Sequence, residues 1–169
     1  LGQICDEEQR VCLPRRWSVT RSSDLPVLQE IELRGITAKD DENAWLASSN
    51  GVIRVKGGLR ALNRAATGNG LPSDDVRVVV VDGDYLLAGT AAGVGILNLA
   101  TDEWTQINAD QIGNVSVRAL AMGPDRTIWI GTDGGLFRRA IMDDGSVADS
   151  GQDLTVATGL LDNRINDVL

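Results

Sequence analysis

The sequence predicts an all-β fold made of repeated units. A short apolar strand followed by a glycine-containing turn occurs three times, beginning at Trp45, Leu87 and Trp129. The spacing is 42 residues in both intervals (87 − 45 and 129 − 87). A period of this length, with several strand and turn signals in each unit, is typical of propeller blades. We therefore expect an all-β β-propeller with blades of about four strands.

The first repeat covers 30–66. Its inner strands are expected at 30–38, 44–48 and 52–56. Asn50-Gly51 between two apolar runs is a strong hairpin signal, because both central residues of a type I′ turn need positive φ. The segment 59–66 also has the propensity of a helical turn, but its place in the repeat favours an outer strand.

The second and third repeats, 70–108 and 114–157, follow the same plan. In the second repeat the expected strands are 76–81, 85–89, 94–99 and 104–107, the first of them rich in β-branched residues. In the third repeat the expected strands are 117–122, 127–131, 136–139 and, after an insertion at 143–153, an outer strand at 154–157.

The two ends of the chain each contain part of a repeat. Residues 1–19 have strand signals at 3–5, 10–13 and 17–19, which fit the second, third and fourth strands of a blade. Residues 159–164 resemble 70–75, and 165–169 then fit a first strand. Joined, the ends would make a split fourth blade and close a small ring without free edges. The alternative is that both ends are incomplete blades of a larger propeller, to which further blades would belong.

Composition limits the function. The net charge of −8 argues against a nucleic-acid surface, because phosphate binding needs clustered Lys and Arg. No apolar run approaches the roughly 18 residues of a membrane-spanning helix, so we expect no membrane insertion by this segment. The chain has no histidine, the commonest metal ligand and general base. We therefore expect no catalytic residues, no metal and no cofactor.

Cys5 and Cys12 are the only cysteines in the chain. Their spacing is not a Cys-x-x-Cys redox motif, and two thiolates alone make a poor zinc site. A disulfide across a hairpin is the preferred interpretation, with two free thiols as the alternative. A disulfide would indicate an extracytoplasmic setting.

Two segments carry a family resemblance. At 70–76, and again at 120–136, the chain resembles the two-component-regulator propeller repeat, with its Gly-Leu-Pro-Ser-Asn-like entry, an aspartate turn and a Leu-Trp-Ile-Gly-Thr strand. The resemblance covers roughly 30–169, with Leu87 in place of the tryptophan and Ala47-Ser48 in place of Gly-Thr. It implies an extracytoplasmic sensing or binding module, of the kind that precedes a membrane span and a histidine kinase or occurs in secreted proteins.

Three arginines recur near the start of the expected first strands. Arg34, Arg77 and Arg118 each follow an apolar residue, and Asn166 takes this place in the partial fourth unit. First strands line the central channel of a propeller, so these four residues are the candidate ligand-binding set, for an anionic ligand. The alternative is that the arginines form ion pairs with nearby acids such as Asp74, Asp75 and Asp110.

Other candidates favour structural roles. Trp45 and Trp129 share one repeat position and offer stacking platforms for a ligand, but large rings at this position are expected to fill the space between blades. The acidic stretches 40–42 and 143–153 contain possible calcium ligands, yet their spacing fits no EF-hand loop. We interpret both as solvated turns.

The predicted function is a non-enzymatic, extracytoplasmic (periplasmic or secreted) recognition or sensing module that binds a protein or a carbohydrate. The first alternative is a structural or assembly subunit of a larger complex. The second is a propeller glycosidase or lyase, which would need paired acids in the channel, whereas this sequence has its acids mainly in turns.

Overall fold

A computed structural model describes residues 3–6, 11–14, 30–149 and 153–168. The chain divides into two units, 1–30 and 31–169. The smaller unit contains the antiparallel pair β1 (Gln3–Asp6) and β2 (Val11–Pro14). The strand expected at 17–19 lies outside the described residues.

The register of this pair bears on the cysteines. Cys5 is the direct cross-strand partner of Cys12. Cα atoms of directly opposite residues in antiparallel pairs lie about 4.5–5.5 Å apart, which is within the range of about 4.4–6.8 Å that a disulfide requires. The disulfide stays a prediction. We expect the intact mass to rise by about 2 Da on reduction, and an unchanged mass with both thiols alkylated in the absence of reductant would contradict it.

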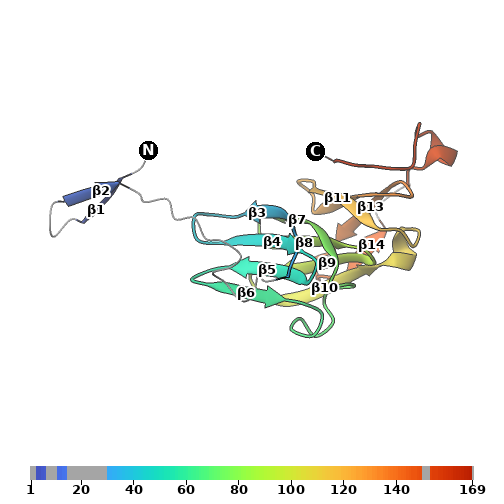
Figure 1. The fold of residues 1–169 in the computed structure, drawn as a ribbon. Helices are drawn as coiled ribbons and strands as arrows, with labels where there is room; N and C mark the ends of the chain where they lie inside the picture. Colours follow the sequence, from blue (N-terminus) through green and yellow to red (C-terminus); the bar gives the residue numbers. More distant parts are fainter. Residues whose placement is uncertain (1–2, 7–10, 15–29, 150–152, 169) are drawn as a thin grey trace. The chain divides into compact units, whose positions relative to one another are not determined.

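The larger unit contains three four-stranded antiparallel sheets, each a meander in chain order (Figure 1). Blade 1 consists of β3 (Leu33–Ala38), β4 (Ala44–Ser48), β5 (Gly51–Val55) and β6 (Leu59–Leu62). Blade 2 consists of β7 (Val76–Asp82), β8 (Tyr85–Thr90), β9 (Gly93–Asn98) and β10 (Glu103–Asn108). Blade 3 consists of β11 (Val117–Met122), β12 (Thr127–Thr132), β13 (Leu136–Ile141) and β14 (Val147–Asp149).

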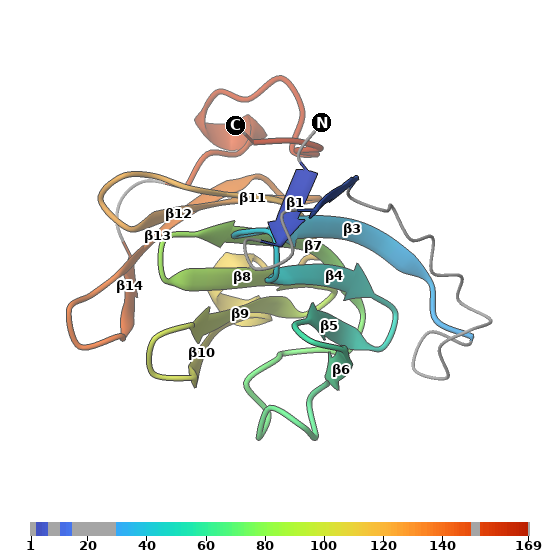
Figure 2. The same ribbon diagram turned by 90° about the vertical axis from the view of Figure 1, so that its left-hand side faces the viewer.

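The three blades are arranged as in a propeller. The first strands β3, β7 and β11 lie side by side, while the outer strands β6, β10 and β14 fan apart (Figure 2). Short 3₁₀ turns, Ala109–Ile112 and Val156–Thr158, are the helical elements of the described residues. The prediction of an all-β propeller fold with four-stranded blades is confirmed.

Two expected strands are wrong. The outer strand of blade 3 is β14, inside the segment that the sequence suggested as an insertion, and not 154–157. The chain turns sharply before it, since the Met142 amide donates to the Ser146 carbonyl at 2.8 Å and Asp144 accepts from the Ser146 amide. The described residues 165–168 form no strand. Pairing of the two chain ends into a fourth blade stays a prediction.

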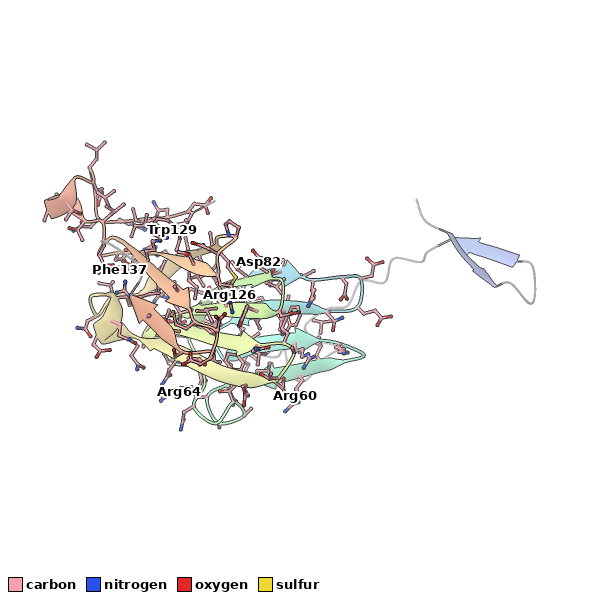
Figure 3. All side chains as sticks on the ribbon, turned by 180° about the vertical axis from the view of Figure 1, so that it is seen from behind. Arg60, Arg64, Asp82, Arg126, Trp129 and Phe137 are labelled. Atoms are coloured by element: carbon pink, nitrogen blue, oxygen red, sulfur yellow. The ribbon has the colours of Figure 1, made fainter. Side chains whose placement is uncertain are left out.

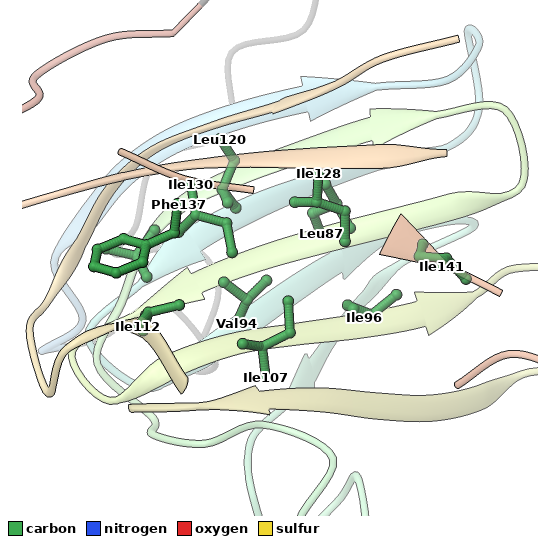
Figure 4. Close-up of a cluster of buried hydrophobic side chains, with 11 residues drawn as sticks. Leu87, Val94, Ile96, Ile107, Ile112, Leu120, Ile128, Ile130, Phe137 and Ile141 are labelled. Atoms are coloured by element: carbon green, nitrogen blue, oxygen red, sulfur yellow. The ribbon is translucent and has the colours of Figure 1, made fainter. Parts of the chain in front are cut away.

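The hydrophobic core lies between neighbouring blades. One cluster, including Leu87, Val117, Ile128 and Ile130, fills the space between blades 2 and 3 (Figure 4). A second cluster, including Trp45, Val76 and Leu97, fills the space between blades 1 and 2. Because burying one such side chain is worth about 1.5–3 kcal/mol, stacking of blades holds the unit together. Trp45 is 1% exposed, which confirms its packing role.

The turns between the second and third strands have the same hydrogen-bond pattern in all three blades. A buried hydroxyl at the end of the second strand accepts a hydrogen bond from a turn amide and donates to the carbonyl of the turn glycine. The three hydroxyls belong to Ser48, Thr90 and Thr132. The glycines that follow have φ between 93° and 139°, and a Cβ there would collide with the backbone of the next outer segment.

Candidate functional site

Each first strand contains a β-bulge at the same repeat position. The register shifts between Leu33 and Gly35, between Val76 and Val78, and between Val117 and Ala119. The residues inside these bulges are the three recurring arginines, Arg34, Arg77 and Arg118. A bulge leaves its extra residue out of the ladder and re-aims its side chain. The sequence therefore located the arginines, and the structure adds the reason for their shared placement.

Asp75 links the arginines of blades 1 and 2. It precedes β7, forms an ion pair with Arg34, and accepts a hydrogen bond from the Arg77 guanidinium at 3.3 Å. Arg34 also forms an ion pair with Glu32 at 3.0 Å. The interpretation of these arginines as ion-paired with Asp75 is thus correct for two of the three.

Asp133 performs the corresponding role in blade 3. It lies in the turn between β12 and β13 and accepts a hydrogen bond from Arg118 Nε at 2.5 Å. Arg164, from the segment after blade 3, approaches the same carboxylate at 3.8 Å. The other acids suggested from the sequence do not form these contacts, and Asp74 instead accepts the backbone amide of Arg64 at 2.6 Å.

Asn166 does not join the arginines. It follows Ile165, whose amide donates to the Thr132 carbonyl at 2.8 Å, and its exposed side chain forms no hydrogen bond within the described part of the chain. Arg164, two residues earlier, is the member of this segment that reaches the site. The sequence contains a signal for it, because Arg164 occupies the repeat position of Asp75, which immediately precedes the first strand of blade 2.

The arginines lower the pKa of both bridging carboxyls. The hydrogen bond from Arg34 is the main cause for Asp75, and the hydrogen bond from Arg118 is the main cause for Asp133. Arg164 and Arg77 add coulombic attraction at Asp133. The site thus contains four arginines and three acids, which we call the arginine array, and it carries one excess positive charge although the whole chain is strongly acidic. Its members are Arg34, Arg77, Arg118, Arg164, Glu32, Asp75 and Asp133.

A pH prediction follows from these shifts. A carboxyl whose pKa is lowered by folding stabilises the protein above its unfolded pKa of about 3.9, and this stability is lost as pH falls through the lower, folded value. We expect Asp75→Asn to be less stable than wild type at neutral pH, with a difference that shrinks below about pH 4. Urea unfolding between neutral and acidic pH measures this. The control is Asp82→Asn, an exposed carboxylate without an ion pair in the described residues, and an equal pH dependence in both variants would contradict the assignment.

The three arginine side chains remain partly accessible, with exposed fractions of 26%, 35% and 28% for Arg34, Arg77 and Arg118. A guanidinium with one donor edge engaged still has donors for a carboxylate, sulfate or phosphate. Among the described residues, no group of three or more His, Cys, Asp or Glu side chains is placed to hold a metal ion. The chemistry that this array offers is therefore hydrogen bonding and charge pairing with an anionic or polar ligand.

Comparison with known proteins supports the fold. One similar solved structure is the extracellular domain of the putative hybrid two component system BT4673 from B. thetaiotaomicron, at TM-score 0.56 and 19% identity, covering 81% of this chain and 19% of that one. A second is the extracellular domain of the putative hybrid two component system BT3049 from the same organism, at TM-score 0.55 and 21% identity, covering 69% of this chain and 16% of that one. Streptogramin B lyase is also similar, at TM-score 0.53 and 16% identity, covering 69% of this chain and 39% of the lyase.

The fold is that of a β-propeller. This chain spans between about a sixth and two fifths of the length of these propeller-like structures. A scan of protein-family models gave no match, and a search of curated proteins gave none either. Within the described residues, no helix has the length and apolar character needed to cross a membrane.

Proposed function

We propose that this chain is part of a non-enzymatic, extracytoplasmic recognition module that binds a protein or a carbohydrate. The observation that carries the proposal is the repeated bulge, which projects an arginine from each of three adjacent first strands at the same end of the blades. Bulges are over-represented next to functional sites, where they re-aim a side chain. The proposed ligand-binding residues are Arg34, Arg77 and Arg118, and Asn166, which the sequence suggested as a fourth, does not join them.

The comparisons support the setting but not the ligand. Two of the similar structures are extracellular domains of two-component systems, which agrees with the predicted periplasmic or secreted location. The third is an enzyme by its title, so the fold alone does not decide the activity. We propose a non-enzymatic role because the chain has no histidine and the carboxylates of the arginine array are held by ion pairs.

A ligand screen tests this function. A panel of neutral and acidic oligosaccharides is added to the protein, and the thermal unfolding midpoint and product formation are followed. We expect at least one ligand to raise the midpoint without being cleaved. Arg77→Gln and Arg118→Gln should abolish the shift, while Arg126→Gln, which removes an ion-paired arginine from the turn between β11 and β12, should retain it. Turnover of a ligand, or a shift unaffected by the first two variants, would contradict the proposal.

A specific observation favours the structural alternative. Ile36 is 70% and Leu33 is 45% exposed on β3, whereas the residues at the same repeat positions in β7 and β11 are buried. The face of blade 1 that carries Leu33 and Ile36 is therefore suited to packing against a partner. Self-association at micromolar concentration that Ile36→Ser abolishes would support an assembly role, and a monomer at these concentrations would exclude it.

A further inference from the structure

Two arginines face each other across the outer strands of blade 1. Arg54 of β5 is the direct cross-strand partner of Arg60 of β6. Like charges directly opposite each other destabilise a sheet, and no carboxylate in the described part of the chain forms an ion pair with either one. Both arginines line a hollow of about 300 Å³ on the surface of blade 1. Lys56 lines this hollow too and adds a third positive charge. A cluster of cations that forms no ion pair among the described residues is unexpected in a chain with a net charge of −8.

Arg54 also has an unused donor. Its Nε is buried and has no hydrogen-bond partner, and a buried donor of a charged group is costly to leave unpaired. The fold does not require an arginine at this repeat position, because blade 2 has the buried Ile96 there. Blade 3 has Arg138, whose Nε is also unbonded, but its guanidinium approaches Asp125 at 3.7 Å and lies 5.4 Å from the centroid of the Trp129 ring. Within the described ranges, Arg54 has neither an ion pair nor an aromatic ring beneath its guanidinium.

The second wall of the site comes from blade 2. Arg54 and Arg60 line, together with Thr67 and Trp104, a hollow of about 160 Å³ between the outer strands of the two blades. The Trp104 side chain packs directly against two glycines. A Cβ at Gly70 would collide with the Trp104 side chain, and a Cβ at Gly95 would lie 3.2 Å from its ring. Figure 3 shows Arg60 at the edge of the molecule formed by these outer strands, with Arg64 of the following loop near the same edge.

We propose that this hollow is an oxyanion-binding site, in which Arg54 and Arg60 hold a carboxylate, sulfate or phosphate group and Trp104 packs against the body of the ligand. Guanidinium groups match the geometry of such oxyanions and form strong, charge-assisted hydrogen bonds with them. An anion between the two arginines also removes their mutual repulsion. Asp102 also lines this hollow, and its negative charge favours a ligand with a single anionic group over a polyanion. The site lies on the outer strands and does not depend on the bulge arginines.

The test is a binding titration at constant ionic strength, followed by the NMR signal of the Trp104 indole N–H. The probes are sodium sulfate, sodium phosphate, D-glucuronate and, as the neutral comparison, D-glucose. We expect saturable shifts with the anionic probes and none with glucose. A tighter response to glucuronate than to the inorganic ions indicates a sugar-borne carboxylate, and an equal response indicates a free oxyanion. Both outcomes support the site.

The variants decide whether the arginine pair is responsible. Arg54→Gln and Arg60→Gln should each weaken binding at least about tenfold, the effect expected for losing one charge-assisted hydrogen bond. Arg64→Gln, which removes the same charge from a nearby exposed position, should change affinity less than about twofold. In chloride buffer, Arg60→Gln should unfold at the same or a higher temperature than wild type, because it relieves the repulsion. No saturable binding of any anion, an equal loss in Arg64→Gln, or destabilisation by Arg60→Gln in chloride would overturn the proposal.

Discussion

Replacing Trp45 with alanine is expected to lower the free energy of unfolding by about 3–5 kcal/mol, the range observed for truncation of large buried aromatic side chains. Trp45 is 1% exposed and lies in the cluster between blades 1 and 2, with Val76 and Leu97 among its neighbours. The surrounding residues belong to two sheets whose backbones are fixed by their ladders, so we expect the cavity to collapse only in part. Urea unfolding followed by circular dichroism measures the change.

Trp129 is the matched control for this variant. It occupies the same repeat position in blade 3, but it is only partly buried, and one of its faces is covered by the Arg138 guanidinium. We expect Trp129→Ala to cost about 1–2 kcal/mol, from partial burial and the cation–π contact. Equal losses in the two variants would mean that Trp45 is not packed between two blades, and would contradict the assignment of the core.

The second large effect is expected at Leu120. It is 5% exposed in the cluster between blades 2 and 3, so Leu120→Ala should lower the free energy of unfolding by about 2–5 kcal/mol. Ile36 has the same repeat position in blade 1 and is 70% exposed. Ile36→Ala should therefore change stability by less than about 0.5 kcal/mol.

Because Leu120 and Ile36 share a repeat position and differ in burial, the two variants show whether burial decides the loss of stability. If Ile36→Ala were as destabilising as Leu120→Ala, blade 1 would have to be covered by another part of the protein or by a second copy. The comparison is made at several protein concentrations, because a stability that rises with concentration would identify a second copy as the cover.

The repeat made most of the blade architecture predictable. The 42-residue spacing aligned the second strands, and the turn glycines Gly51, Gly93 and Gly135 follow at one position. Ser48 looked like a departure from the Thr of the other repeats, yet its hydroxyl forms the same two hydrogen bonds. What the fold conserves at this position is a short hydroxyl side chain, which sequence comparison by residue identity does not reveal.

Two segments depart from the repeat because local turn signals and the lack of a partner strand decide their structure. The sequence suggested 143–153 as an insertion and the outer strand of blade 3 at 154–157, whereas Asp143-Asp144-Gly145-Ser146 is a turn sequence after which β14 pairs directly with β13. A first strand was expected at 165–169 from similarity to blade 2. A strand needs a partner ladder, and the described residues after Ile165 have none.

The candidate site was predictable in its arginines and not in its acids. A recurring arginine at the start of a strand is visible in the sequence, and its bulge follows from backbone geometry that the sequence does not specify. Asp133 belongs to a turn on a different pair of strands from Arg118, so only the fold brings the two together. The Arg54–Arg60 pair was missed for the same reason, because like charges opposite each other become visible only with the register.

One blade-to-blade contact is repeated along the chain. In the structure, a branched side chain of the following segment packs directly on a glycine of the second strand. A Cβ on Gly89 would lie 2.6 Å from Val117 Cγ1, and a Cβ on Gly131 would lie 2.7 Å from Ile165 Cγ2. Side-chain methyl NOE spectroscopy tests this most directly. We predict strong cross-peaks from the Gly89 Hα protons to a Val117 methyl group, and from the Gly131 Hα protons to an Ile165 methyl group. If the Val117 methyl groups instead showed cross-peaks only within their own blade, the stacking of blades in chain order would be contradicted.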